Sequence, residues 1–143
     1  MNYENARIVK LRDYLFDVLT KILEEKTITI NANMLSKNIK NYSLDKIPSA
    51  SVVERWINGC VKHKDVYSFR SRRIYSTDEL NNLSNIGFFE KFETIINSNN
   101  RKGVLPQIEN IESIECLNTG TMAGIEQNTA IFDIQIQITY REE

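Results

Sequence analysis

The sequence predicts an α+β domain: one antiparallel sheet built from two hairpins, with helices packed on one face and an N-terminal amphipathic helix. Residues 129–140 alternate apolar and polar side chains, as expected of a strand with one buried and one solvated face. Residues 4–26 repeat apolar side chains at steps of three and four, which is the helical period. A helical segment between two predicted strand pairs completes the α+β pattern.

Length, composition and charge limit the possible classes. The chain, residues 1–143, has the size of a single domain, and its 41% hydrophobic residues suffice for a core. Its formal net charge of −1 gives no general attraction to nucleic acid, so no specific nucleic-acid partner is expected. No run approaches the roughly 18 apolar residues of a membrane span, and no signal-peptide pattern is present, so no membrane partner is expected.

Residues 1–48 comprise the first helix and an irregular segment. The apolar stripe of the helix consists of Ile8, Leu11, Leu15, Val18, Leu19 and Ile22. Asn5 or an earlier residue can cap this helix. Tyr14 and Phe16 lie outside the stripe, where they either meet a neighbouring element or pack ordinarily on the sheet. Residues 27–30 are predicted as a short strand, whereas the apolar residues of 31–48 are too scattered to predict an element.

The first hairpin is predicted from residues 52–57 and 66–75. Asn58 and Gly59 lie between the two strands and suit a turn that needs positive φ. Because the strands are separated by more than the two residues of a tight turn, we expect a wide or bulged hairpin.

A short basic cluster lies near the end of the second strand of this hairpin. Alternation places Tyr67, Phe69 and Arg73 on one face, and Arg70 and Arg72 on the other. Two interpretations remain open. The arginines either cover a solvated strand edge or contact an acidic partner, for which bidentate arginine–carboxylate pairs fix orientation.

Residues 76–85 and 88–99 are predicted as helices, with a break around Gly87. Ser76 and Glu79 have the spacing of a capping box, and the glycine of residues 97–103 marks the helix exit. The second helix is strongly aromatic along one side, which predicts packing across the inner face of the sheet. This apolar stripe consists of Phe88, Phe89, Phe92, Ile95 and Ile96.

The terminal hairpin is predicted from residues 111–117 and 129–140, joined by a long polar loop at 118–128. The predicted buried face of the last strand consists of Phe132, Ile134, Ile136, Ile138 and Tyr140. Its outer face consists of Asp133, Gln135, Gln137 and Thr139. Such an amide-rich face can pair with another copy at little desolvation cost, or it is simply solvated.

The chain lacks the residue patterns that catalysis and metal binding usually need. Cys60, Cys116 and His63 are its only cysteines and histidine, too few for a usual zinc site. Cys60 and His63 are close in sequence, but no oriented base or oxyanion site accompanies them. Cys116 fits a small buried hydrophobic residue. No enzymatic activity, no cofactor and no metal are therefore expected.

Four sequence blocks in the second half of the chain share an order and spacing with a known family. They read I-G-F-F-E-K-F at 86–92, N-R-K-G-V-L-P at 100–106, I-E-S-I-E-C-L-N-T-G at 111–120 and N-T-A-I-F-D-I-Q-I-Q-I-T-Y at 128–140. Through them, residues 50–142 resemble the phage tail terminator or minor capsid (tail completion) proteins of Gram-positive phages and phage-tail-like bacteriocins. Residues 1–48 carry little of the resemblance.

The resemblance implies a virion structural protein that forms a ring, a hexamer, on the head-proximal end of a tail tube. Such a ring ends tube polymerisation and joins the tube to the neck, collar or head–tail connector protein, with the sheath as a further partner. The implied location is the virion or tail-like particle, after assembly in the bacterial cytoplasm. Two alternatives stay open: a head-completion or adaptor protein of the virion, and a regulatory binding module outside any particle.

Two contact regions are expected in such a subunit. The first is the arginine cluster, which consists of Arg70, Arg72 and Arg73. The second is the polar loop at 118–128, which is long enough to reach a neighbouring subunit or the tube. Its expected contact residues are Asn118, Thr119, Thr121, Met122, Glu126 and Asn128.

Overall fold

The structure of the protein is a computed structural model. It describes residues 6–23, 29–32, 41–48, 52–55, 57, 59–74, 79–118, 121–126 and 129–142. The helices within these residues are α1 (Arg7–Leu23) and α2 (Glu79–Lys102). The strands are β1 (Thr29–Ala32), β2 (Asn41–Ile47), β3 (Val52–Arg55), β4 (Val61–Ile74), β5 (Ile111–Cys116), β6 (Thr121–Glu126) and β7 (Thr129–Glu142).

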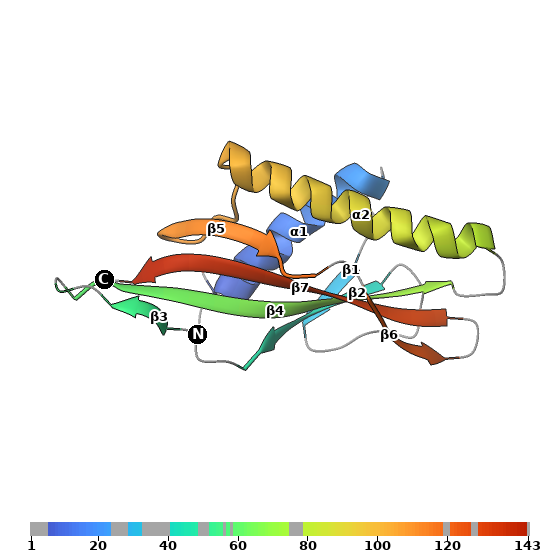
Figure 1. The fold of residues 1–143 in the computed structure, drawn as a ribbon, viewed down its shortest axis with the longest axis horizontal. Coiled ribbons are helices and arrows are strands. Elements are labelled where there is room, and N and C mark those ends of the chain that lie inside the picture. Colours follow the sequence, from blue (N-terminus) through green and yellow to red (C-terminus); the bar gives the residue numbers. More distant parts are fainter. Residues whose placement is uncertain are drawn as a thin grey trace.

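These strands form one sheet in the order β1-β2-β4-β7-β5. β7 pairs with the whole length of β4, so β2 and β3 share the other edge of β4. In the same way, β5 and β6 share the edge of β7 that faces away from β4. Both helices lie on one face of the sheet (Figure 1), which confirms the predicted α+β class. We call this the inner face of the sheet, and the opposite one the outer face.

The pairing at β1 differs from the predicted antiparallel sheet. β1 and β2 run parallel, with Ile30 beside Tyr42. A parallel pair needs a crossover connection rather than a tight turn. Residues 33–40, which connect the two strands, lie outside the described residues. All other strand pairs among the described residues are antiparallel, as predicted.

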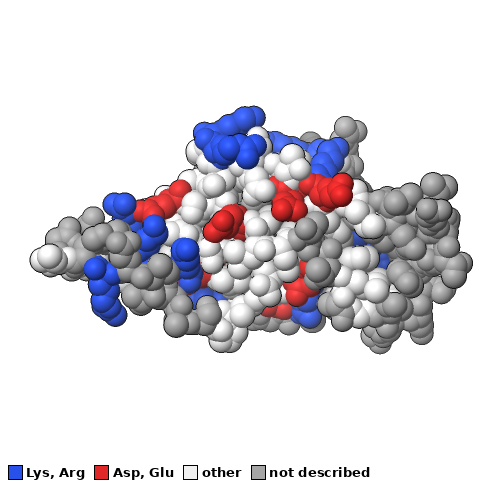
Figure 2. Space-filling view, viewed as in Figure 1, with Lys and Arg blue, Asp and Glu red and all other residues white. Residues whose placement is uncertain are grey.

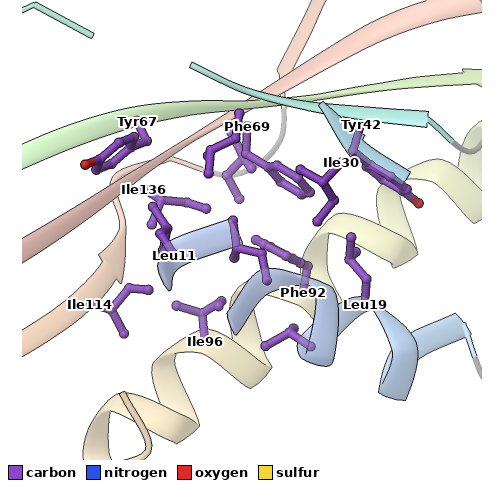
Figure 3. Packing of buried hydrophobic residues seen from close by; sticks show 14 of the residues in the cluster. Leu11, Leu19, Ile30, Tyr42, Tyr67, Phe69, Phe92, Ile96, Ile114 and Ile136 are labelled. Carbon is purple, nitrogen blue, oxygen red and sulfur yellow. The ribbon is translucent and has the colours of Figure 1, made fainter. Parts of the chain in front are cut away.

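The hydrophobic core lies between the inner face of the sheet and the two helices (Figure 3). Phe69 of β4 stands opposite Ile134 of β7, and Tyr67 stands opposite Ile136. All four side chains are at most 1% exposed. The alternation predicted for residues 129–140 is therefore confirmed on the apolar side of β7, which lies under the helices. Thr139, predicted on the solvated side, is only 4% exposed.

Helix α1 buries the stripe that its sequence predicts. Leu11, Leu15 and Leu19 are fully buried, and Ile8 and Ile22 pack at the margin of the core. The amphipathic helix is thus confirmed over Arg7–Leu23. The predicted capping residues lie outside the described part of the chain.

Tyr14 joins the two helices, as one of the two interpretations of its position predicted. Its hydroxyl donates to the Val104 carbonyl at 3.0 Å and accepts from the Asn99 side-chain amide at 3.1 Å. Burial raises the pKa of the Tyr14 hydroxyl, and the Asn99 bond opposes that shift. This contact fixes α1 against the end of α2.

Helix α2 is continuous through Gly87, so the predicted break there is wrong. A glycine inside a helix costs only about 1 kcal/mol relative to alanine. The next two residues, Phe88 and Phe89, are buried in the core and hold the helix on the sheet. Packing therefore outweighs the local preference of Gly87. No helix in the described part of the chain has the length and apolar character needed to cross a membrane.

The predicted glycine exit from α2 is confirmed. Gly103 has a φ of 77°, a conformation that residues with a side chain rarely adopt. Its N–H donates to the Asn100 carbonyl, and the Val104 N–H donates to the Asn99 carbonyl. The predicted cap at Ser76 lies outside the described residues.

Strand β2 has no counterpart among the predicted elements. Its inward-facing Tyr42 and Leu44 are at most 1% exposed, but the next inward-facing residue is Lys46. The Lys46 ammonium lies 3.7 Å from the carboxylate of buried Asp65. This ion pair interrupts the apolar alternation, so periodicity alone does not predict the strand.

The β3–β4 hairpin is wide and bulged, as predicted, but β4 begins at Val61 rather than at residue 66. Gly59, with a φ of 89°, supplies the predicted positive φ in the turn. The early part of β4 is polar and is held by cross-strand partners. Lys62 Nζ lies 3.4 Å from a Glu112 carboxylate oxygen, and His63 Nε2 lies 2.8 Å from a Glu142 carboxylate oxygen.

The polar loop predicted at residues 118–128 is wrong, because this segment contains β6. β6 pairs with β7 from Thr121 opposite Asp133 to Glu126 opposite Thr129. The pairing shifts by one residue near Gly124. The segment has weak strand propensity and no clean alternation, so the pairing partner β7 decides its conformation.

Candidate functional site

The β5–β6 side of the sheet is the first candidate surface. Within the described residues, neither strand pairs with anything beyond β7. An edge strand presents unpaired N–H and C=O groups to any strand that approaches it. On β5, the Ile114 N–H already donates to Asn100 Oδ1 of α2 at 3.1 Å, so β6 is the part of this edge that is better placed to accept a strand from another molecule through main-chain hydrogen bonds.

Asn118 maintains the hydrogen bonding of this edge at the interruption between β5 and β6. The Leu117 N–H donates to the Gln135 carbonyl at 2.8 Å. The Gln135 N–H in turn donates to Asn118 Oδ1 at 2.9 Å, so a side-chain oxygen replaces a strand carbonyl. The interruption thus leaves β7 satisfied along its outer edge at this position.

Replacing Asn118 by alanine is expected to lower the free energy of unfolding by about 1 kcal/mol, because the Gln135 N–H loses its acceptor. Hydrogen exchange should show a faster-exchanging Gln135 amide in Asn118→Ala. The matched control is Asn118→Asp, which retains an oxygen at the same position. Unchanged exchange at Gln135 in the alanine variant would contradict this role.

Two apolar side chains are exposed on the same edge. Leu117 is 45% exposed and Met122 is 48% exposed. Isolated exposed apolar residues are common, but apolar side chains beside an open strand edge make it a candidate contact surface. Met122 was among the contact residues predicted from sequence, and Leu117 was not. We call β5, β6, Met122 of β6 and Leu117, which directly follows β5, the open edge.

The arginine cluster lies on β4, which is flanked by β2 and β7. Its interpretation as a solvated strand edge is therefore wrong. On the outer face, Arg70 Nη2 donates to Asp45 Oδ2 at 2.5 Å. Arg72 is 6% exposed, and its Nη1 donates to the Thr129 hydroxyl at 3.1 Å. The predicted contact of these arginines with an acidic partner molecule stays a prediction.

Arg73 lies on the opposite face from its two neighbours. Its guanidinium stands 4.1 Å from the centre of the Phe88 ring, which attracts cations through its electron-rich face. Burial lowers the pKa of Arg73, while the Tyr42 hydroxyl raises it. Arg73 therefore contributes to the packing of α2 on the sheet.

The two predicted contact regions meet at one end of the sheet. Arg70 stands opposite Asp133 on one side of β7, and Thr121 stands opposite the same residue on the other side. Two strand spacings separate β4 from β6, which is about 10 Å. Thr119 and Asn128 lie outside the described residues, and only the backbone pairing of Thr121 and Glu126 is described.

Sequence reasoning missed a second feature, a cleft of about 600 Å³ at the other end of the sheet. Residues of α1, of the segment before β5 and of the end of β7 line it: Arg7, Lys10, Gln107, Ile108, Glu109, Asn110, Tyr140, Arg141 and Glu142. Several of its charges are already compensated within the chain. Arg141 pairs with Glu112, and Glu142 pairs with His63.

A buried carboxylate lies beside this cleft. Asp65 is 1% exposed, and its Oδ2 accepts from Arg7 Nε and from the Tyr140 hydroxyl, each at 3.2 Å. The Arg7 guanidinium also stands 4.6 Å from the centre of the Tyr140 ring. The signal in the sequence was an aspartate at an inward position of β4, two residues before Tyr67.

Burial dominates the proton affinities around this carboxylate. It raises the pKa of Tyr67 and of Tyr140 to about 12, and the negative charge of Asp65 adds to both shifts while Arg7 opposes them. Burial also raises the pKa of Cys116 to about 12, which disfavours the thiolate form that a nucleophile needs.

Arg7, Asp65 and Tyr140 thus connect α1, β4 and β7. Among the described residues, no group of three or more His, Cys, Asp or Glu side chains is placed to hold a metal ion. The open edge is thus the candidate surface for contact with another molecule. Comparison of the chain with protein-family models and with curated proteins finds no match.

Proposed function

We propose that this protein is a ring-forming structural subunit that caps the head-proximal end of a phage or phage-like tail tube and joins it to the neck. The resemblance of residues 50–142 to tail terminators suggests this class. The observation that carries the proposal is the open edge, where Leu117 and Met122 are exposed on the side of the sheet on which β5 and β6 have no further strand partner among the described residues.

A ring needs one surface that accepts a neighbouring copy without leaving buried polar groups unpaired. The open edge supplies main-chain donors and acceptors for such a contact. On the adjoining outer face, several polar side chains are paired within the chain. Ser68 donates to Asp133 at 2.8 Å, and Gln137 donates to Glu115 at 2.6 Å.

The proposal is tested by the mass of the purified full-length chain in light scattering and by negative-stain images of the protein, alone and mixed with isolated tails. We expect closed rings that bind one end of each tail. Removing the gene from the producing bacterium should give tails of irregular length, and restoring it should return a uniform length.

Two results would contradict the proposal, and each favours one alternative. A stable monomer at all concentrations, absent from assembled particles, favours a regulatory binding module. Copurification with filled heads, and absence from headless tails, favours a head-completion or adaptor protein.

A further inference from the structure

We propose that the subunits associate head to tail: the β3–β4 hairpin tip of one copy, centred on Ile57, docks on the open edge of the next copy. The hairpin tip is defined here as Ile57 with the flanking Arg55 and Gly59. This inference rests on the proposed function, because it names the contact through which the ring forms.

Ile57 is the most exposed of the large apolar residues that the structure describes. It lies in the turn between β3 and β4, and its exposed fraction of 108% equals that of a fully solvated side chain. The hairpin lies at one end of the long axis, beside the C-terminal end of β7 (Figure 1). An apolar side chain at a protruding turn is well placed to enter a contact with another molecule.

The open edge lies too far along the sheet to receive the tip of its own chain. Val61, where β4 leaves the turn, stands opposite Glu142, whereas Met122 stands opposite Phe132. At about 3.3 Å per residue, this part of β7 spans roughly 30 Å. The hairpin tip and the open edge therefore both stay exposed in a single subunit. When copies align in the same direction, the tip of one copy can cover the open edge of the next.

The charges beside the two surfaces differ in net sign. Glu142, which is 64% exposed and stands opposite Val61 at the hairpin, pairs with His63. At the hairpin, Arg55 and Lys64 form no ion pair with any described residue. At the open edge, Glu115 is exposed two residues before Leu117, and Glu93 of α2 acts on the neighbouring Cys116. Figure 2 shows several Lys and Arg at the hairpin end with acidic atoms among them, and further Asp and Glu over the middle of the same face.

A contact between two different surfaces gives every subunit one tip and one edge. Such heterologous contacts form a closed ring when the rotation between neighbours closes. A two-fold dimer can also pair tip with edge, in both directions at once, but it closes with two copies and leaves no tip or edge to build a ring. Charge therefore favours a second copy as the occupant of the open edge, and the proposed ring requires the head-to-tail alignment.

The test uses a tip variant, Ile57→Asp, and an edge variant, Leu117→Asp with Met122→Asp, in the full-length chain. Each variant alone is expected to lose the ring and remain monomeric in light scattering. Mixed in equal amounts, the two should form dimers, because the intact tip of the edge variant meets the intact edge of the tip variant. No larger species should form, since each dimer has one blocked tip and one blocked edge.

Val104→Asp is the matched control, because Val104 is 48% exposed and belongs to neither surface. This variant should form rings as the wild type does, and circular dichroism should show that all variants are folded. If Ile57→Asp still formed rings like those of the wild type, or if the mixture of the two variants stayed monomeric, the inference would be overturned and the proposed ring would stand. A monomeric wild type would instead overturn the proposed function itself.

Discussion

Phe92→Ala is expected to lower the free energy of unfolding by about 3–5 kcal/mol, the usual cost of removing a fully buried aromatic side chain. Phe92 is 0% exposed, and its ring stacks on Phe69 at a centroid distance of 5.3 Å. It also lies 6.5 Å from the Phe88 ring. The substitution removes contacts between α2 and the centre of the sheet and leaves a cavity between them.

Urea denaturation followed by circular dichroism measures this effect. Thr94→Ala is the matched control, because Thr94 is exposed on the same helix and its change should stay within about 0.5 kcal/mol. Phe92→Leu keeps most of the volume and should cost clearly less than the alanine variant. If Phe92→Ala cost no more than Thr94→Ala, the packing of α2 on the sheet would be disproved.

Asp65→Ala is expected to cost about 2–3 kcal/mol at pH 7, because the buried Tyr140 hydroxyl and the Arg7 guanidinium both lose their acceptor. Breaking a fully buried ion pair costs about 3–5 kcal/mol. The effect here is smaller because the side chains of Arg7 and Lys46 are 43% and 51% exposed and can turn to water. The control is Asp13→Ala, which breaks a solvated ion pair with Arg12 and should cost under about 0.5 kcal/mol.

The same variant should change the response to alkaline pH. An unfolded tyrosine ionises near pH 10, whereas the pKa values of folded Tyr67 and Tyr140 are raised to about 12. The unfolded state therefore loses protons first, so stability is intact below pH 10 and falls between about pH 10 and 12. Removing the negative charge of Asp65 should lower both pKa values, although burial keeps them raised.

Denaturation at a series of pH values measures this response. Asp65→Ala should lose less stability than the wild type between pH 10 and 12, and NMR titration should show a lower pKa for Tyr140. Equal slopes in the two proteins would show that Asp65 does not act on these tyrosines.

The candidate site was only partly predictable from sequence. Alternation placed Arg70 and Arg73 on opposite faces of one strand, and the structure agrees. It could not show that β4 is internal to the sheet, because strand order depends on pairing between distant segments. The β5 part of the open edge was predicted as a strand, but the β6 part was predicted as a loop, since the sequence of β6 has no strong period and its strand conformation follows from pairing with β7.

The sequence by itself determined the elements with a strong apolar period: α1, β7 and the aromatic half of α2. Burial of their apolar sides is local in sequence, so side-chain spacing alone shows which face is covered. Tertiary structure decided what local spacing cannot express. The Lys46–Asp65 ion pair allows β2 to turn a lysine inward, and packing of Phe88 carries α2 through Gly87. Pairing with β7 makes a strand of β6, because hydrogen bonds and burial from distant segments outweigh weak local preferences.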